Sequence, residues 1–329
     1  MAVIGIDLGT TNSLAGVWQD GKVVLIPNAF GEYLTPSVVG IGKNQEVFVG
    51  SVAKEMLATQ PYDTFREFKR NMGTNFLYGN GRKKYRAEEL SAFVLRRLKE
   101  DAEKFLGEEV TEAVISVPAY FDDNKRNATK NAGRLAGLKV ERLINEPSAV
   151  ALKHHTAEKG AESFIVFDFG GGTLDVSLVE AFDNVVEIQA VAGDNYLGGK
   201  DFNEIIAQDF YEQNQISEAY LTKNEQENVL KEAEAVKKEL TDKNEAERQV
   251  YIKGEAYTLK MTNQRLIHLS AELFSRMAKP IAKVINMVGI ELEELDKVIL
   301  VGGSSKMPVV QQYINCLLYT SPSPRDGLL

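Results

Sequence analysis

Cysteine and histidine are scarce in this chain of 329 residues. The one cysteine, Cys316, excludes a disulfide framework and a cluster of thiolate metal ligands. The three histidines, His154, His155 and His268, lack the spacing of metal ligands. We therefore expect neither a zinc site nor a fold that depends on disulfides.

Long apolar runs and excess positive charge are also missing. Because no stretch of 18 apolar residues is present, the sequence predicts no membrane span. The formal net charge of −9, without a run of lysine and arginine, argues against a nucleic-acid surface. The first residues do not have the pattern of a signal peptide, so we expect a cytoplasmic protein. The length predicts two domains, each with its own core.

The first motif with functional chemistry spans residues 3–12, where an apolar run ends in Asp7 and a glycine–threonine turn follows. The run predicts a buried strand. Gly9 permits backbone geometry closed to residues with a Cβ, and Thr10 and Thr11 supply hydroxyl donors. The carboxylate of Asp7 could hold a hydrated metal ion. Taken alone, the motif is equally typical of a β-hairpin with an ordinary polar turn.

A second copy of this motif spans residues 164–175 and contains Asp168, three glycines, Thr173 and Asp175. Each copy is followed by another apolar stretch, so the pattern of strand, turn and strand occurs twice. Turn amides bind anions, and Mg²⁺ is held by few carboxylates together with water. We expect the two hairpins to hold a phosphate chain from both sides, with Asp7 and Asp168 converging on one cation.

Predicted strands and helices alternate in the rest of the chain, which indicates an α/β layered fold. The predicted strands are residues 23–26, 46–49, 113–117, 140–144, 185–191 and 298–301, of which the first two should extend the sheet of the first hairpin; a hairpin is predicted at 249–261. The predicted helices are residues 52–59, 87–106, 123–137 with Asp122 as its cap, 202–213, 228–241 and 266–287, the last bent or broken by Pro280. Pro118, Glu146 and Asp168 fall at the carboxyl ends of strands, where ligands bind in such folds.

Two polar clusters have alternative interpretations. The pair Lys69–Arg70 could be a solvated basic pair at a helix end. Alternatively, Lys69 could lie beside the phosphates of a ligand. The polar face of helix 228–241 fits either a ligand surface or a solvated face with a Glu234–Lys238 ion pair. The glycines of residues 193–199 indicate a hinge or a phosphate-lining loop, and residues 302–306 form a third glycine-rich turn.

Six motifs occur in a fixed order: residues 6–13, 117–121, 144–147, 167–175, 197–202 and 301–304. With these motifs the chain resembles the nucleotide-binding domain of heat-shock protein 70 family chaperones (DnaK and relatives) over residues 1 to about 315. Residues 68–74 look most like the HscC type. The resemblance implies an actin-like ATPase fold with a nucleotide cleft. It also implies lobe I at 1–163, with a peripheral subdomain at about 36–86, and lobe II at 164–315, with one at about 198–268.

The resemblance implies an ATPase module that switches the affinity of a separate substrate-binding domain for unfolded polypeptide. It implies ATP or ADP, Mg²⁺ and K⁺ as cofactors, and a J-domain co-chaperone and a nucleotide exchange factor as partners. A small-molecule kinase and a nucleotide-dependent filament or scaffold protein on the same fold remain alternatives.

Carried onto this sequence, the family pattern implies catalysis by Asp7, Lys69, Glu146, Asp168 and Thr173. It implies metal binding by Asp7, Asp168 and Asp175, the last for a monovalent cation, and a relay of nucleotide state by Pro118. It implies nucleotide binding by Gly9, Thr10, Thr11, Asn12, Gly170, Gly171, Gly172, Thr173, Gly198, Gly199, Glu234, Lys237, Lys238, Thr241, Gly302, Gly303, Ser304 and Lys306.

The end of the sequence departs from the family pattern. We expect the closing segment of the nucleotide-binding domain, the linker and the substrate-binding domain to be missing, because residues 316–329 look like a translated sequencing adapter. We therefore expect a non-native tail in which Leu317, Leu318, Leu328 and Leu329 are poorly buried. We also expect a marginally stable chain with weak or no ATPase activity.

Overall fold

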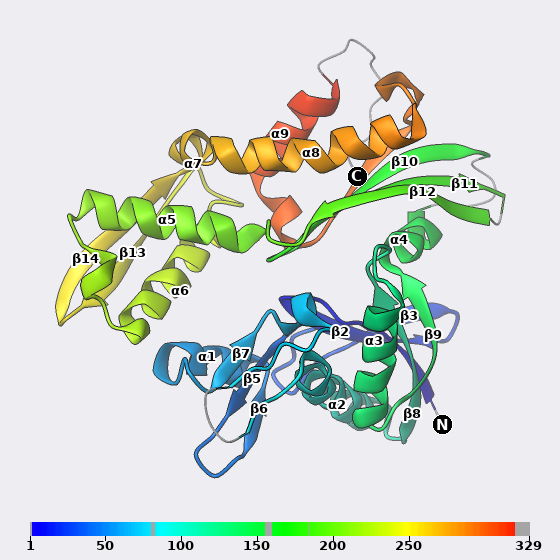
Figure 1. Ribbon diagram of the computed structural model, residues 1–329, viewed down its shortest axis with the longest axis horizontal. Helices are drawn as coiled ribbons and strands as arrows, with labels where there is room; N and C mark the ends of the chain where they lie inside the picture. Colours follow the sequence, from blue (N-terminus) through cyan, green and yellow to red (C-terminus); the bar gives the residue numbers. More distant parts are fainter. Residues whose placement is uncertain (1, 80–82, 155–159, 184, 320–329) are drawn as a thin grey trace. The chain divides into compact units, whose positions relative to one another are not determined.

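The computed structural model describes residues 2–79, 83–154, 160–183 and 185–319 (Figure 1). His155, Leu328 and Leu329 lie outside these residues. The chain divides into two compact units, Met1–Ala149 and Val150–Leu329, and each is described by itself. Among the described residues, no helix is long and apolar enough to cross a membrane.

The main sheet of the first unit follows the predicted hairpin. Its order is β3-β2-β1-β8-β9, and the short strand β4 (Thr35–Pro36) pairs with β2 beside this path. Strands β1, β2 and β3 are antiparallel, whereas β1, β8 and β9 are parallel. The strands are β1 (Ala2–Asp7), β2 (Asn12–Gln19), β3 (Lys22–Ile26), β8 (Val110–Val117) and β9 (Lys139–Asn145).

Helices α2 (Ala87–Leu106) and α3 (Asp123–Leu135) lie beside this sheet (Figure 1). Helix α2 has the predicted bounds, and its buried residues include Leu90, Val94 and Leu98, which recur at helical spacing. The predicted cap of α3 is confirmed, because the side chain of Asp122 accepts a hydrogen bond from the backbone N–H of Lys125.

A smaller sheet in the first unit corrects one prediction. Strand β6 (Val47–Val49) does not extend the main sheet but pairs with β5 (Val38–Ile41), which also pairs with β7 (Thr64–Arg66). Helix α1 (Ser51–Thr59) packs on β5 so closely that a Cβ on Gly40 would lie 2.7 Å from the sulfur of Met56. Local sequence predicts a strand but not which strand it pairs with.

The main sheet of the second unit repeats the arrangement of the first. Its order is β12-β11-β10-β15, with β10, β11 and β12 antiparallel and β15 parallel to β10. In both units, the strand that leads into the glycine-rich turn is therefore flanked by its hairpin partner and by a parallel strand. The strands are β10 (Glu162–Phe169), β11 (Leu174–Phe182), β12 (Val185–Asp194) and β15 (Lys297–Val301).

The helices of the second unit bury one side of this sheet. The rings of Phe169, Phe202 and Phe274 contact one another edge to face and connect β10 with α5 and α8. The remaining elements are α4 (Glu146–His154), which spans the division between the units, α5 (Gly199–Gln213), α6 (Lys223–Glu239), the hairpin of β13 (Glu245–Ile252) and β14 (Glu255–Thr262), α7 (Asn263–Leu269), α8 (Ala271–Val288) and α9 (Pro308–Tyr319).

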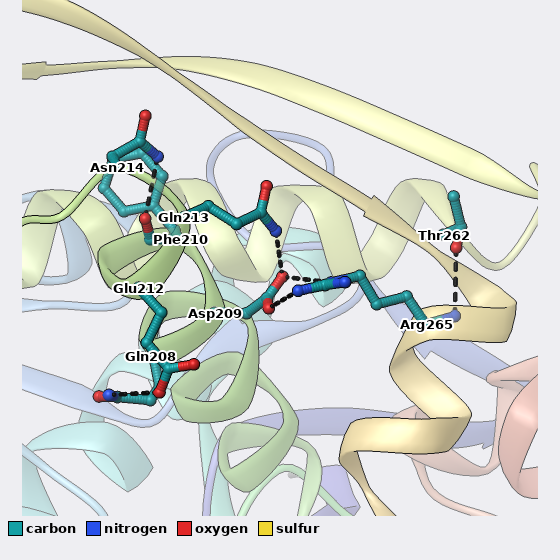
Figure 2. Close-up of polar contacts among 8 residues, drawn as sticks. All are labelled: Gln208, Asp209, Phe210, Glu212, Gln213, Asn214, Thr262 and Arg265. Carbon is teal, nitrogen blue, oxygen red and sulfur yellow. Dashed lines mark hydrogen bonds and ion pairs between the residues drawn. The ribbon is translucent and has the colours of Figure 1, made fainter.

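An ion pair joins α5 to α7 in this unit, and Figure 2 shows its geometry. The guanidinium of Arg265 donates to both oxygens of Asp209, at 2.9 and 2.5 Å. Gln213 donates a further hydrogen bond to Asp209 at 2.6 Å. The Asp209 side chain is only 2% exposed, whereas that of Arg265 is 48% exposed. The buried carboxylate therefore depends on these donors for its solvation.

The helix predicted at 266–287 breaks at a different place. The break lies at Ser270, between α7 and α8, and Pro280 lies inside α8. Pro280 removes one backbone donor, but Met277, Ile281 and Val284 are buried on both sides of it. Packing of this apolar face holds the helix together through the proline.

Helix α9 corrects the expectation for the first residues of the tail. The helix continues through Cys316 to Tyr319, and Leu318 is buried at 8% exposure in the core of the unit. Because Val310, Ile314 and Leu318 are spaced four residues apart, they lie on one helix face. The predicted poor burial is wrong for Leu318, and Leu317 packs against the same core. The non-native origin of residues 316–329 stays a prediction.

Candidate functional site

The turn after β1 carries the predicted phosphate-binding residues of the first unit. Asp7 ends β1 opposite Leu14, and Asn12 is the first residue of β2. A Cβ at Gly9 would lie 2.1 Å from the backbone oxygen of Asn12, so only glycine fits this position. Thr10 and Thr11 are partly exposed at the turn, and Asn12 is exposed. The side chains of Thr10, Thr11 and Asn12 are therefore accessible to a ligand.

Serine hydroxyls that the sequence reasoning missed hold this turn in place. The Ser37 hydroxyl donates to the backbone oxygen of Gly9 at 2.7 Å, and the Ser13 and Ser37 hydroxyl oxygens lie 2.9 Å apart. The backbone N–H of Ser37 also donates to the oxygen of Thr11 at 2.8 Å. Ser13 and Ser37 are both buried. Their sequence gives no signal, because the contact joins residues 24 positions apart.

Lys69 lies in a 3₁₀ helix, η1 (Phe68–Asn71), and is 7% exposed. Its ammonium donates to Glu146 Oε1 at 2.8 Å. Arg70 is paired separately with Glu67 at 2.6 Å, and the side chains of both basic residues are 8% exposed. The alternative of a solvated basic pair is therefore wrong. The fold instead brings a buried lysine to the first residue of α4.

The electrostatics of Glu146 identify its neighbours. Burial raises the pKa of the Glu146 carboxyl, the Lys69 ammonium opposes this shift, and the negative charge of Asp7 adds to it. Asp7 in turn accepts a hydrogen bond from the Ser116 hydroxyl at 3.1 Å. Asp7, Lys69 and Glu146, which are far apart in the sequence, thus belong to one charged cluster at the carboxyl ends of β1 and β9.

Pro118 directly follows β8 and is buried, as expected for a residue at the carboxyl end of a strand.

Arg126 of α3 donates to the oxygen of Phe121 at 2.8 Å and to Asn145 Oδ1 at 2.8 Å. This arginine joins the loop after β8 to the residue that precedes Glu146.

The corresponding turn of the second unit lies between β10 and β11. Asp168, one residue before the end of β10, is the cross-strand partner of Asp175. A Cβ on Gly302 would lie 2.7 Å from Asp168 Oδ1, so the third glycine-rich segment passes directly beside this carboxylate. Gly302 also has a φ of +87°, which favours glycine. The C=O of Thr173 closes the turn by accepting from the N–H of Gly170 at 3.0 Å.

A second segment, residues 198–200, supports this turn through backbone hydrogen bonds. The N–H groups of Gly199 and Lys200 donate to the oxygens of Gly170 and Gly171 at 3.0 and 2.9 Å. A Cβ on Gly198 would lie 2.4 Å from the nitrogen of Gly172. Glycine is needed at position 198 because the two backbones touch. The predicted role of this loop, as a hinge or as a lining of the phosphates, stays a prediction.

Lys237 and Ser304 complete the packing around Gly199. The buried Lys237 ammonium donates to the oxygen of Gly199 at 2.7 Å. A Cβ on Gly199 would lie 2.1 Å from the Ser304 hydroxyl oxygen and 3.0 Å from Lys237 Nζ. The three glycine-rich segments of this unit therefore meet at one place.

The other predicted residues of this unit lie farther toward solvent. Lys238 is 66% exposed and forms the Glu234 ion pair at 2.9 Å that a solvated face predicts. Thr241 follows the end of α6, and its N–H donates to the oxygen of Lys238. Gly303 has open space at its Cβ position, and Lys306 is exposed at the end of η5 (Gly303–Lys306).

A carboxylate beside a glycine-rich turn fits a hydrated Mg²⁺ ion that also binds phosphate. No group of three or more acidic, histidine or cysteine side chains that could hold a metal occurs in the parts of the chain that the structure describes. Mg²⁺ typically uses one or two carboxylates and completes its shell with water and phosphate. Each unit offers a carboxylate beside a glycine-rich turn. A Cβ would collide with backbone at Gly9 of the first turn and at Gly198 of the loop beside the second turn.

The sequence matches the family model described as Hsp70 protein over residues 3–325, so the chain belongs to the Hsp70 family. Members of this family are chaperones with an actin-like fold and ATPase activity, and they bind ATP or ADP with Mg²⁺. The match includes residues 316–325 of the segment that we predicted to be non-native.

Proposed function

We propose that this chain is the ATP-hydrolysing module of a chaperone and that it switches the affinity of a substrate-binding domain for unfolded polypeptide. The buried Lys69–Glu146 ion pair beside Asp7 is the observation that carries the proposal. A protein that only binds nucleotide has no need to bury a lysine and a glutamate at the carboxyl ends of its strands. Buried ion pairs bring little net stability, so their presence favours a functional role.

In this proposal the two turns bind the phosphates through backbone amides and threonine hydroxyls. Thr10, Thr11 and Thr173 would donate hydroxyl hydrogen bonds to the phosphates, and the carboxylates of Asp7 and Asp168 would hold Mg²⁺ through water. When bound, Mg²⁺ neutralises charge on the phosphoryl oxygens. Positioning and electrostatic stabilisation account for most of the rate of phosphoryl transfer, and both turns are rigidly supported.

Lys69 and Glu146 would act on the attacking water. The ammonium of Lys69 stabilises the negative charge that develops on the γ-phosphate. Glu146 holds this ammonium at 2.8 Å and can accept a hydrogen bond from water with its other oxygen. Burial of both groups keeps solvent from screening them.

Several finer assignments belong to the proposal as well. We assign Glu234, Lys237, Lys238 and Thr241 to one side of the nucleoside and Gly302, Gly303, Ser304 and Lys306 to the other. We assign K⁺ to the Asp175 carboxylate, which lies across from Asp168. The HscC type, the J-domain co-chaperone, the exchange factor, the two lobes with their peripheral subdomains and the cytoplasmic location stay predictions.

The test is single-turnover ATP hydrolysis by the chain without a phosphate acceptor. Lys69→Ala should keep nucleotide binding and lower the rate roughly 10²–10³-fold, because one preorganised charge is removed from the transition state. Arg70→Ala is the matched control, since Arg70 is as buried in the same short helix but pairs with Glu67. Hydrolysis by Lys69→Ala at the parent rate would contradict the assignment. A parent chain that binds no nucleotide would contradict the proposed function itself.

A further inference from the structure

One arginine of the second unit has two contacts whose role the proposed mechanism does not include. Arg276, in the first half of α8, donates from Nε and Nη2 to Asp194 Oδ2 at 3.2 and 2.8 Å. Its Nη2 also donates to the backbone oxygen of Tyr196 at 3.0 Å. The Arg276 and Asp194 side chains are 30% and 27% exposed. One side chain thus binds two successive points of the loop that follows β12.

The segment 194–199, from the last residue of β12 to the first residue of α5, is named the bracing loop. Both carboxylate oxygens of Asp194 accept hydrogen bonds. Oδ1 accepts from the N–H of Tyr196 at 2.9 Å, and Oδ2 accepts from Arg276. The far end of the loop is the segment whose Gly199 N–H binds the oxygen of Gly170. The near end is held by Arg276, and the far end is held by Lys237 at the oxygen of Gly199.

The bracing loop determines where the phosphate-binding turn lies. Because Gly198 lies against Gly172 at a distance that excludes even a methyl group, the turn cannot move toward the loop. Because Gly199 and Lys200 hydrogen-bond the oxygens of Gly170 and Gly171, the turn cannot move away without losing both bonds. A shift of the loop would therefore be transmitted to the turn.

We propose that Arg276 is a positioning residue for phosphate binding, which fixes the bracing loop from α8 and through it the turn at Gly170, Gly171 and Gly172. The inference rests on the proposed function for its catalytic consequence. Arg276 does not touch the turn, so its effect is carried entirely by the bracing loop. Displacements of about 1 Å at a positioned phosphoryl group are enough to cost up to 10²-fold in rate.

The first measurement needs no nucleotide. In the full chain, Arg276→Met keeps the apolar stem but loses all three hydrogen bonds. Amide hydrogen exchange at Gly199 and Lys200 should become about tenfold faster in Arg276→Met, since these N–H groups are the ones that hold the turn. Arg248→Met is the control, because it removes a partly exposed arginine–carboxylate pair of the same unit, with Glu239, and should leave these two amides unchanged. Unchanged exchange at Gly199 and Lys200 in Arg276→Met would overturn the proposal.

The second measurement is the dissociation constant for Mg²⁺–ADP together with the single-turnover rate for ATP. Arg276→Met should weaken binding and slow turnover, each about tenfold, and Arg276→Lys should recover part of the loss because lysine can reach one acceptor. Asp194→Asn combined with Arg276→Met should be no worse than Arg276→Met alone, since both act on one contact. A lower unfolding temperature with the parent dissociation constant and rate would show a purely structural role and overturn the proposal. If the parent binds no Mg²⁺–ADP, the proposed function fails, and the exchange measurement still decides whether Arg276 fixes the loop.

Discussion

The two glycine-rich turns have similar sequences, but different forces hold them. In the first unit, the neutral hydroxyls of Ser13 and Ser37 support the turn from within the protein. In the second unit, the backbone of another loop supports it through Gly199 and Lys200. The charged pair of Arg276 and Asp194 then holds that loop.

The difference follows from side-chain size. The first turn carries Thr10 and Thr11, and the hydroxyl that reaches its backbone comes from Ser37, between β4 and β5. The second turn carries three consecutive glycines, which allow another backbone to approach within contact distance. Two turns that present the same groups to a ligand can therefore respond differently to mutation, salt and pH.

Among the variants that separate the two turns, the largest effect should come from adding a methyl group to the first turn or to the bracing loop beside the second. Gly9→Ala places a Cβ 2.1 Å from the oxygen of Asn12, and Gly198→Ala places one 2.4 Å from the nitrogen of Gly172. In both cases the backbone must shift, and we expect a loss of about 10²-fold in single-turnover ATP hydrolysis. The rate is measured beside thermal unfolding of each variant.

Gly5→Ala is the control for these substitutions. Its added Cβ would meet only the oxygen of Gly16 at 3.9 Å, which is an ordinary contact on the exposed face of β1. An equal loss of hydrolysis in Gly5→Ala would show that any added methyl harms the chain, and the steric argument for the turns would be wrong.

The next largest effect concerns the charge pair of Figure 2 in the second unit. Arg265→Met leaves the buried Asp209 carboxylate with only the Gln213 amide, so we expect a loss of about 3 kcal/mol in the free energy of unfolding. Asp209→Asn should cost less, about 1 kcal/mol, because Arg265 is half exposed and can turn to water. Urea unfolding of both variants measures the difference between the two losses of unfolding free energy, and equal losses would contradict this prediction.

A smaller effect is expected for the hydroxyl support of the first turn. Ser37→Ala leaves the backbone oxygen of Gly9 and the buried Ser13 hydroxyl without their shared partner, which should cost about 1–2 kcal/mol in unfolding free energy. Ser13→Ala removes only the hydrogen bond between the two hydroxyls, so it should cost less unfolding free energy. Added salt should change neither loss of unfolding free energy, because both hydrogen bonds join neutral groups. A salt-dependent loss would argue against hydroxyl support.

The smallest effect concerns pH and the first unit. Glu103 Oε1 accepts from Lys99 at 2.5 Å and from the backbone N–H of Val110 at 3.1 Å. The hydrogen bond from Lys99 and then that from Val110 hold the pKa of the Glu103 carboxyl below its usual 4.5. A lowered carboxyl pKa stabilises the fold above the unfolded pKa, and this stability is lost as the pH falls below it.

Because Glu103 is partly exposed, its contribution should be no more than about 0.5 kcal/mol. Glu103→Gln should reduce the loss of unfolding free energy between about pH 5 and about pH 3 by this amount. The measurement is a series of urea titrations across that range. If the unfolding free energy of the variant fell more steeply with decreasing pH than that of the parent, the prediction would be contradicted.

Much of the fold could be predicted because its signals are local. The bounds of α2, the cap at Asp122 and both hairpins follow from apolar periodicity, capping chemistry and turn residues within a few positions of one another. The errors arose where tertiary packing decides. β6 pairs with β5 because α1 covers that small sheet, and α8 continues through Pro280 because its buried face holds it.

The sequence by itself determined that the chain has two carboxylate-and-glycine turns and a third glycine-rich segment. It also determined that Lys69 and Glu146 were candidates for catalysis. Only the tertiary structure decided that Lys69 is buried against Glu146, that serines hold the first turn, and that Arg276 holds the loop behind the second. The physical reason is the range of the interactions. Helices and turns depend on neighbours within about four residues, whereas these contacts join residues 77, 28 and 82 positions apart.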